Sequence, residues 1–382
     1  MPHTSPIPLT KFRARRIWLR AQRLDEAAPF GGGALATPAA VQHLGYVQID
    51  TINVVERCHH QILYTRIPDY RRDHLRQAQS VDKTVFEYWT HALSYIPTAD
   101  MRFFVRAMKR EADDRSSFFH TVKRGDLQKV LGRIRRNGPL TIRDIDDDVL
   151  VEKDHEWASR KPSKRALQLA FYRGVLTVSQ REGMLKTYEL MTRHFGRHAL
   201  PKAASESERT AYLLDRALRS QGIVSLDSIC HLDAPRKVAV SRVIDARVRR
   251  SELVPVAVEG AKHEHWATSE MLDTGLDPVA DIVHILNPFD PVVIQRKRLA
   301  SLFDYEHRFE AYVPKEKRVF GYFAQPVLVG DAVVAVLDLK TDRERGKLLM
   351  RKWTWLSKGD RRRLKGLIEG ALGRFERFQL AR

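Results

Sequence analysis

The first fifty residues show helix-like and then strand-like patterns of hydrophobic residues. After Thr10, which can cap a helix, the apolar residues of 12–24 fall on one side and arginines on another. We therefore predict an amphipathic basic helix, followed by a shorter helix that has Thr37 as its cap and ends near Leu44. Residues 46–52 are rich in β-branched and aromatic residues, which predicts an extended segment.

A pattern of three helices followed by two strands then occurs twice. The predicted helices of the first copy are 126–136, 142–150 and 163–172, and its strands are 175–178 and 184–188. The second copy has helices at 205–222, at 225–229 and from Pro235 onward, and strands at 253–258 and 265–268. This order is typical of a winged helix. The repetition favours tandem duplication, with the first segment as a third and more elaborated copy.

Strand patterns dominate after residue 278. Strands are predicted at 319–329, 332–339 and 348–356, and a closing helix at 358–378. The predicted fold class is α+β, with three tandem winged-helix domains followed by a small C-terminal β-barrel with a closing helix. The corresponding domain ranges are 1–124, 125–200, 201–272 and 273–382.

The composition indicates which class of partner the protein binds. The chain has 382 residues, of which 43% are hydrophobic, so it has enough apolar material for several buried cores. Lys and Arg number 66 against 47 Asp and Glu, and the formal net charge is +19. A positive field of this kind attracts polyanions, and nucleic acid is the leading partner.

Several functional classes do not fit the sequence. No apolar run approaches the roughly 20 residues that cross a bilayer, and the amino terminus lacks a signal-peptide pattern, so we expect the protein in the cytosol. Cys58 and Cys230 have no paired spacing, which predicts neither a disulfide framework nor a zinc site. There is no Walker loop and no dinucleotide fingerprint. We expect no cofactor and no metal.

Gln48 and Asp50 form an unusual polar pair within the predicted extended segment. In an extended segment the two side chains face the same way. A carboxylate beside a basic helix would repel DNA phosphates unless it had a task. A structural role is the alternative, in which Asp50 caps the following turn and Gln48 bonds to the backbone. The spacing by itself favours the structural role.

Three stretches resemble signatures of the YcaQ/AlkZ family of bacterial DNA glycosylases, in the family's order. They are residues 44–55 with Arg57 and 64–66, then Glu87-Tyr88-Trp89-Thr90-His91, then 287–293 with Gly321-Tyr322-Phe323. The resemblance covers nearly the whole chain and implies three winged helices and a β-barrel that form a concave DNA-binding surface. Gln48-Ile49-Asp50 is similar to the Gln-x-Asp branch, which is implied to excise alkylated bases, including N7-alkylguanine and interstrand crosslinks.

The resemblance implies catalytic roles for Gln48 and Asp50. An N7-alkylated guanine is cationic and leaves readily, so one carboxylate that activates water or stabilises the sugar is enough. The motif has no lysine nucleophile, and we expect monofunctional hydrolysis that leaves an abasic site. The residues expected to bind DNA lie in the basic helix, near the motif, in the second signature and at the barrel. They are Arg13, Arg16, Asn53, Arg57, Tyr88, Trp89, His91 and Lys340.

We expect a monomer that acts on double-stranded DNA with alkylated or crosslinked bases, in the bacterial cytosol and nucleoid. The alternative is a non-catalytic winged-helix transcriptional regulator, which needs neither Gln48 nor Asp50. A third reading is an RNA-binding or architectural protein that uses the basic surface.

Overall fold

The chain folds into two compact units. The computed structural model describes residues 5–113, 119–146, 149–153, 159–196, 200–273 and 280–381. Unit 1 comprises Met1–Arg71 and Thr210–Arg382, and unit 2 comprises Arg72–Arg209. The four domain ranges expected from the sequence divide the chain more finely than these two units and stay a prediction. The boundary after Arg71 divides the range 1–124 between the two units. Within the described residues, no helix has the length and apolar character needed to cross a membrane.

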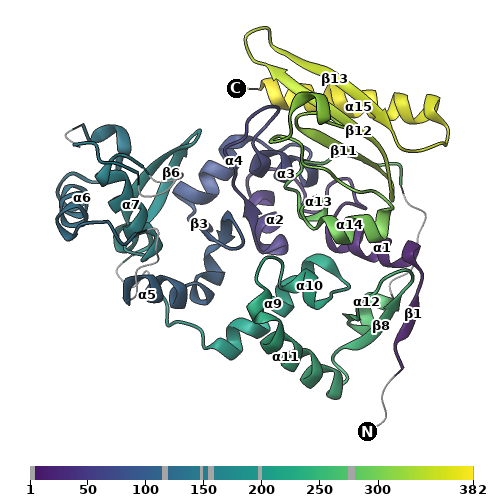
Figure 1. Cartoon of the computed structure of the whole chain (residues 1–382), viewed down its shortest axis with the longest axis horizontal. Helices are drawn as coiled ribbons and strands as arrows, with labels where there is room; N and C mark the ends of the chain where they lie inside the picture. Colours follow the sequence, from purple (N-terminus) through teal and green to yellow (C-terminus); the bar gives the residue numbers. More distant parts are fainter. Residues whose placement is uncertain are drawn as a thin grey trace. The chain divides into compact units, whose positions relative to one another are not determined.

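Unit 1 contains the amino-terminal helices, a helical module with a hairpin, and the C-terminal sheet (Figure 1). Its helices are α1 (Lys11–Ala21), α2 (Ala36–Leu44), α3 (Cys58–Arg66), α9 (Glu206–Gln221, which begins ahead of the unit boundary), α10 (Leu226–Ile229), α11 (Lys237–Arg249), α12 (Ser269–Asp273), α13 (Pro291–Ile294), α14 (Arg296–Phe303) and α15 (Arg361–Leu380). Its strands are β1 (Ile7–Leu9), β2 (Val47–Gln48), β8 (Val254–Val258), β9 (His265–Ala267), β10 (Val283–Ile285), β11 (Ala324–Val329), β12 (Ala332–Asp342) and β13 (Lys347–Trp355).

The two amino-terminal helices begin in different ways. The predicted cap of α1 is confirmed, since the Thr10 side chain accepts the Arg13 N–H at 3.2 Å. The prediction for α2 is wrong, because its N-cap is Leu35 and Thr37 lies inside the first turn, where it is buried. Pro38 is tolerated there because the first turn of a helix does not use its N–H groups.

The C-terminal strands form an open antiparallel sheet in the order β10-β11-β12-β13, and α15 packs on it (Figure 1). The closed barrel that we predicted is corrected to this open sheet, because β10 and β13 are its two edges and do not pair in the described part of the chain. Strand β12 is longer than its neighbour: β11 pairs with Ala332–Asp338, whereas β13 pairs as far as Asp342. One edge of β12 is therefore not covered by β11 beyond Asp338.

The predicted second copy of the helix-and-hairpin pattern is present in unit 1 as α9, α10, α11, β8 and β9. Ser225 and Ser228 cap α10 reciprocally, with N–H to Oγ distances of 3.2 and 2.9 Å. Just before this cap, Val224 forms a bridge with Trp266 of β9. Strand β1 adds to β8 in parallel.

Unit 2 contains the predicted first copy and the hairpin that precedes it. Its elements are α4 (Arg72–Arg76), a π-helical turn (Gln77–Val81), β3 (Val85–Trp89), β4 (Leu93–Pro97), a 3-10 helix (Thr98–Phe103), α5 (Val105–Asp113), α6 (Arg124–Asn137), β5 (Leu140–Thr141), a 3-10 turn (Ile142–Asp144), α7 (Pro162–Tyr172), β6 (Leu176–Glu182), β7 (Leu185–Leu190) and α8 (Met191–Phe195). The predicted helix 142–150 is reduced to the 3-10 turn, and residues 147–148 lie outside the described residues.

The first copy and the hairpin of unit 2 share a buried ion pair. Glu87 of β3 and Arg181 of β6 are bonded in a bidentate manner, with N–O distances of 2.5 and 2.7 Å. Gln79 also donates to Glu87, at 2.9 Å. Although burial opposes it, the Arg181 guanidinium keeps the pKa of Glu87 below its ordinary value. The first residue of the second signature therefore has a structural role in this fold.

Candidate active site

The segment with Gln48 and Asp50 runs between α2 and α3 in unit 1. Helix α2 ends at Gly45, whose φ of 78° lies in the left-handed region. A Cβ at this position would collide with the side chain of Arg216. Glycine therefore allows the tight turn from α2 into β2, which places the motif directly after a helix end.

Asp50 begins a turn instead of continuing a strand. Only Val47–Gln48 has strand structure, so the extended segment predicted for 46–52 is shorter than expected. The Asp50 Oδ1 atom accepts the Ile52 N–H at 2.8 Å, which forms an Asx turn. Its Oδ2 accepts no hydrogen bond from the residues that the structure describes. Gln48 is 6% exposed, whereas Asp50 is half-exposed.

Cys58, the first residue of α3, ties this segment to the helix. Its thiol donates to the Gln48 carbonyl, with an S–O distance of 3.0 Å, and the backbone N–H of Asp50 interacts with the sulfur. Burial raises the pKa of the Cys58 thiol well above its ordinary value, and the Asp50 carboxylate acts in the same direction. The group therefore stays a protonated thiol, which can act as a donor.

The loop that follows Asp50 is bound to the uncovered edge of β12. The Thr341 N–H donates to the Val54 carbonyl at 3.0 Å, and the Thr341 hydroxyl donates to the Val55 carbonyl at 3.0 Å. The Arg343 Nη2 atom donates to Asn53 Oδ1 at 2.8 Å and to the Val55 carbonyl at 3.0 Å. The motif is thus held on one side by α3 and on the other by the C-terminal sheet.

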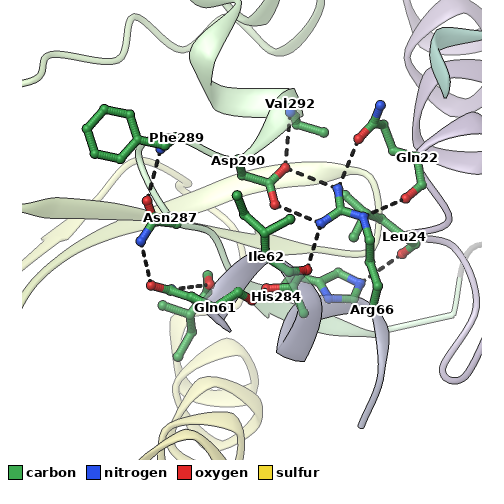
Figure 2. Close-up of polar contacts among 12 residues, drawn as sticks. Gln22, Leu24, Gln61, Ile62, Arg66, His284, Asn287, Phe289, Asp290 and Val292 are labelled. Atoms are coloured by element: carbon green, nitrogen blue, oxygen red, sulfur yellow. Dashed lines mark hydrogen bonds and ion pairs between the residues drawn. The ribbon is translucent and has the colours of Figure 1, made fainter. Parts of the chain in front are cut away.

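A buried ion pair lies at the other end of α3 (Figure 2). Arg66 donates to Asp290 through Nη1 at 2.8 Å and Nη2 at 3.1 Å, and both side chains are 0% exposed. Arg66 also donates to the backbone and side-chain oxygens of Gln22, at 3.0 and 2.9 Å. Asp290 accepts the Val292 N–H at 3.0 Å and so caps α13. The pair joins α3 to the ends of α1 and α13.

An uncharged network lies beside this pair (Figure 2). Gln61 of α3 donates to the Ile285 carbonyl at 2.9 Å, and its Oε1 accepts from Asn287 at 2.8 Å. Asn287 Oδ1 accepts the Phe289 N–H at 3.0 Å. Asn287 and Asp290 belong to the third signature, so this signature holds the C-terminal region on α3. The roles of Gln61 and Arg66 could not be predicted from the sequence, because no local pattern marks either residue as buried.

The Gly321-Tyr322-Phe323 part of the third signature is a loop that two carboxylates hold by its amides. Glu310 accepts the Gly321 N–H at 3.0 Å, and Asp338 accepts the N–H groups of Tyr322 and Phe323 at 3.2 Å each. Gly321 has a φ of 135°, and a Cβ there would collide with the Asp338 carboxyl group. Glycine is therefore required at this position.

The other candidate residues of unit 1 have different environments. Arg13 is half-buried and donates through Nη2 to the Leu272 carbonyl. Arg16 and Arg57 are also half-buried, and Arg57 is the N-cap residue of α3. Lys340 is exposed on β12, next to the residue that contacts the motif loop.

In unit 2, the second signature splits between core and surface. Tyr88 is 4% exposed and its hydroxyl donates to the Tyr172 carbonyl at 2.7 Å. This is a core position, and the DNA contact expected of Tyr88 stays a prediction. Trp89 is 41% exposed, with its ring 5.8 Å from that of Tyr172, and His91 is half-exposed.

No three His, Cys, Asp or Glu side chains in the described ranges lie together in a way that could hold a metal ion. The candidate chemistry of the segment 48–50 is that of the Asp50 and Gln48 side chains. These are a carboxylate with one oxygen fixed by a turn and an amide on the preceding strand.

Two comparisons relate the whole chain to known proteins. The DNA glycosylase AlkZ of Streptomyces sahachiroi has a similar structure, with a TM-score of 0.63 and 15% sequence identity over 98% of this chain and 97% of that one. At this identity the likeness shows a shared fold. The family described as "DNA glycosylase AlkZ-like" matches residues 41–378, a range that includes all three signatures. The chain belongs to the AlkZ-like DNA glycosylase family.

Proposed function

We propose that this chain is a monofunctional DNA glycosylase that hydrolyses the N-glycosidic bond of alkylated bases, with Asp50 and Gln48 as catalytic residues. The observation that carries the proposal is the state of the Asp50 carboxylate. It is half-exposed, its Oδ1 is fixed by the Ile52 N–H, and its Oδ2 accepts no hydrogen bond from the described part of the chain. A carboxylate in this state can orient water or face a developing positive charge.

The reaction needs little more than this carboxylate. Alkylation at N7 gives guanine a positive charge, so the base leaves without protonation by a general acid. Asp50 accepts a proton from the attacking water or stabilises the oxocarbenium-like sugar, as carboxylates do in glycoside hydrolysis. Gln48 orients the water or the sugar by hydrogen bonds. The product is an abasic site, since the motif contains no lysine that could form a Schiff base.

We propose double-stranded DNA with alkylated or crosslinked bases as the substrate, bound by a monomer. The proposal is supported by the net charge of +19, which favours phosphate contacts. Arg16, Arg57, Trp89, His91 and Lys340 are at least partly exposed and stay candidates for DNA contact.

Arg13 and Asn53 are proposed in a supporting role. Each already bonds within the fold, Arg13 to the Leu272 carbonyl and Asn53 to Arg343. Because each side chain already forms a hydrogen bond within the protein, it is better suited to hold a neighbouring segment in place than to bind DNA directly.

We also propose that the two helix-and-hairpin modules are winged helices. The sheet of the first module has the order β5-β7-β6, so the short strand after the first helix pairs with the last strand. In the second module Val224 pairs with β9 in the corresponding position. Both modules cap the next helical turn reciprocally, through Thr141 with Asp144 and through Ser225 with Ser228.

The test is release of N7-methylguanine from a methylated duplex by wild type, Asp50→Asn and Gln48→Ala. Asn can keep the turn, because its side-chain oxygen still accepts the Ile52 N–H. We expect Asp50→Asn to bind DNA and to lose about 10²- to 10⁴-fold in excision rate. Glu344→Gln makes the same charge change on an exposed residue and should keep the wild-type rate.

The regulator remains the second candidate because Asp50 does form the Asx turn that a structural role requires. A wild-type protein that binds duplex DNA and frees no base from any alkylated substrate would support the regulator. In that case Asp50→Asn should bind DNA as wild type does, since the turn is retained.

A further inference from the structure

The β12–β13 hairpin combines exposed cations with a contact to the loop that follows Asp50. Its exposed cations include Lys340, Arg345, Lys347 and Arg351. The turn that follows β12 also contains Arg343, which is exposed and donates to the loop that follows Asp50. This contact links the basic hairpin to the loop that follows Asp50, although the two segments are far apart in the chain.

The contact is possible because β12 is longer than β11. Strand β11 pairs with β12 no further than Asp338, so the β12 edge that faces away from β13 is open at Thr341. The Val54 carbonyl occupies this edge and accepts the Thr341 N–H at 3.0 Å. The loop is thus attached to β12 by a backbone hydrogen bond that is independent of the side chains of the hairpin turn.

The Arg343 side chain adds two hydrogen bonds to this loop. One nitrogen, Nη2, has two hydrogens, and its two acceptors are Asn53 Oδ1 at 2.8 Å and the Val55 carbonyl at 3.0 Å. Arg345, in the same turn, differs in its side-chain contacts. Its side chain is 81% exposed and it reaches Asp342 only at 4.0 Å.

We propose that Arg343 is a positioning residue for the candidate catalytic loop. By fixing Asn53 and Val55, it sets the direction in which the Asx turn presents the Asp50 carboxylate, and it couples this direction to the turn of the hairpin. The proposal rests on the proposed glycosylase function. It assigns Arg343 to the rate of base excision and the other exposed cations of the hairpin to DNA affinity.

The experiment compares Arg343→Lys, Arg343→Ala and Arg345→Ala. Single-turnover excision is measured at saturating methylated duplex, and the dissociation constant is measured by fluorescence anisotropy. Lys keeps the charge, but its ammonium on a flexible stem lacks the rigid planar geometry that directs the two Nη2 hydrogens of Arg343 to Asn53 and Val55. We expect Arg343→Lys to bind DNA within about twofold of wild type, since the charge is kept. Its excision rate should fall about 10- to 100-fold, as for a misplaced catalytic group. Arg345→Ala should bind DNA more weakly than wild type.

A double-mutant cycle with Asn53→Ala locates the effect. If Arg343 acts through Asn53, the double variant Asn53→Ala with Arg343→Ala should be little slower than Arg343→Ala alone. Additive losses, or a full saturated rate for Arg343→Lys, would overturn the proposal.

Hydrogen exchange separates this proposal from the glycosylase function. The Thr341 and Ile52 amides donate to the loop and to Asp50, respectively. Both should exchange faster in Arg343→Ala than in Arg345→Ala, whether or not the protein excises a base. An inactive wild type would refute the function, whereas unchanged exchange at both amides would refute the positioning role.

Discussion

Replacement of Asp290 by Asn tests the buried ion pair that docks α3. Asn retains an oxygen that can accept the Val292 N–H, so the cap of α13 is kept. The change leaves the Arg66 guanidinium, which is 0% exposed, without a counter-charge. Removal of one partner of a buried pair costs about 3–5 kcal/mol. Because the bonds from Arg66 to Gln22 remain, we expect a loss of about 3 kcal/mol, at the lower end of that range.

Urea unfolding of the full chain measures this loss. Four of the six tryptophans belong to unit 1, among them Trp18, which is fully buried in its core, so intrinsic fluorescence mainly follows this unit. With a slope of about 3 kcal/mol per molar urea, the midpoint of unit 1 should fall by about 1 M. The control is Glu369→Gln, which breaks an exposed pair with Lys365 on α15 at 3.6 Å. It should change the free energy of unfolding by about 0.5 kcal/mol or less.

A midpoint for Asp290→Asn equal to that of the control would refute the reasoning, since an unpaired buried guanidinium cannot be free of cost. The double variant Arg66→Met with Asp290→Asn provides a second check. It buries no charge, so it should recover much of the loss.

Three further predictions concern single groups of unit 1. Cys58→Ser keeps a donor for the Gln48 carbonyl and should retain base excision, whereas Cys58→Ala should slow single-turnover excision about tenfold. Gly321→Ala should lower the melting temperature and destabilise the fold by about 1–3 kcal/mol, because the new Cβ meets the Asp338 carboxyl at a φ of 135°. Burial lowers the pKa of His284 to about 4. In the unfolded state the pKa of this histidine is about 6.5, so the unfolded state binds more protons than the folded state between pH 6.5 and 4. The free energy of unfolding should therefore be constant above this range and should fall as the pH drops through it. The urea midpoints at pH 7 and pH 5 should differ less in His284→Gln than in wild type.

Much of the secondary structure followed from local patterns. The predicted helices at 126–136 and 163–172 are α6 and α7, and the predicted closing helix is α15. Caps and hydrophobic periodicity act within a few residues, so a sequence can reveal them directly. The error at Thr37 has a different origin, because the helix begins two residues earlier than its local cap signal, with Leu35 as the N-cap and Ala36 and Thr37 buried. The barrel was wrong for a different reason: closure depends on whether two distant edge strands pair.

The candidate site also combines features that are local in the sequence with contacts that are not. Gln48 and Asp50 could be singled out from the sequence, since they stand together in a short motif, and the Asx turn of Asp50 is a local contact. The contacts that hold this motif are not local. Arg66 and Asp290 are 224 residues apart, and Asn53 and Arg343 are 290 residues apart. Such pairs have no periodicity that a sequence could show, because their partners meet only when hydrophobic burial packs α3 and β12 together. The sequence by itself thus determined the helices, the hairpins and the motif; the tertiary structure decided which buried charges are paired and how the Asp50 loop is held.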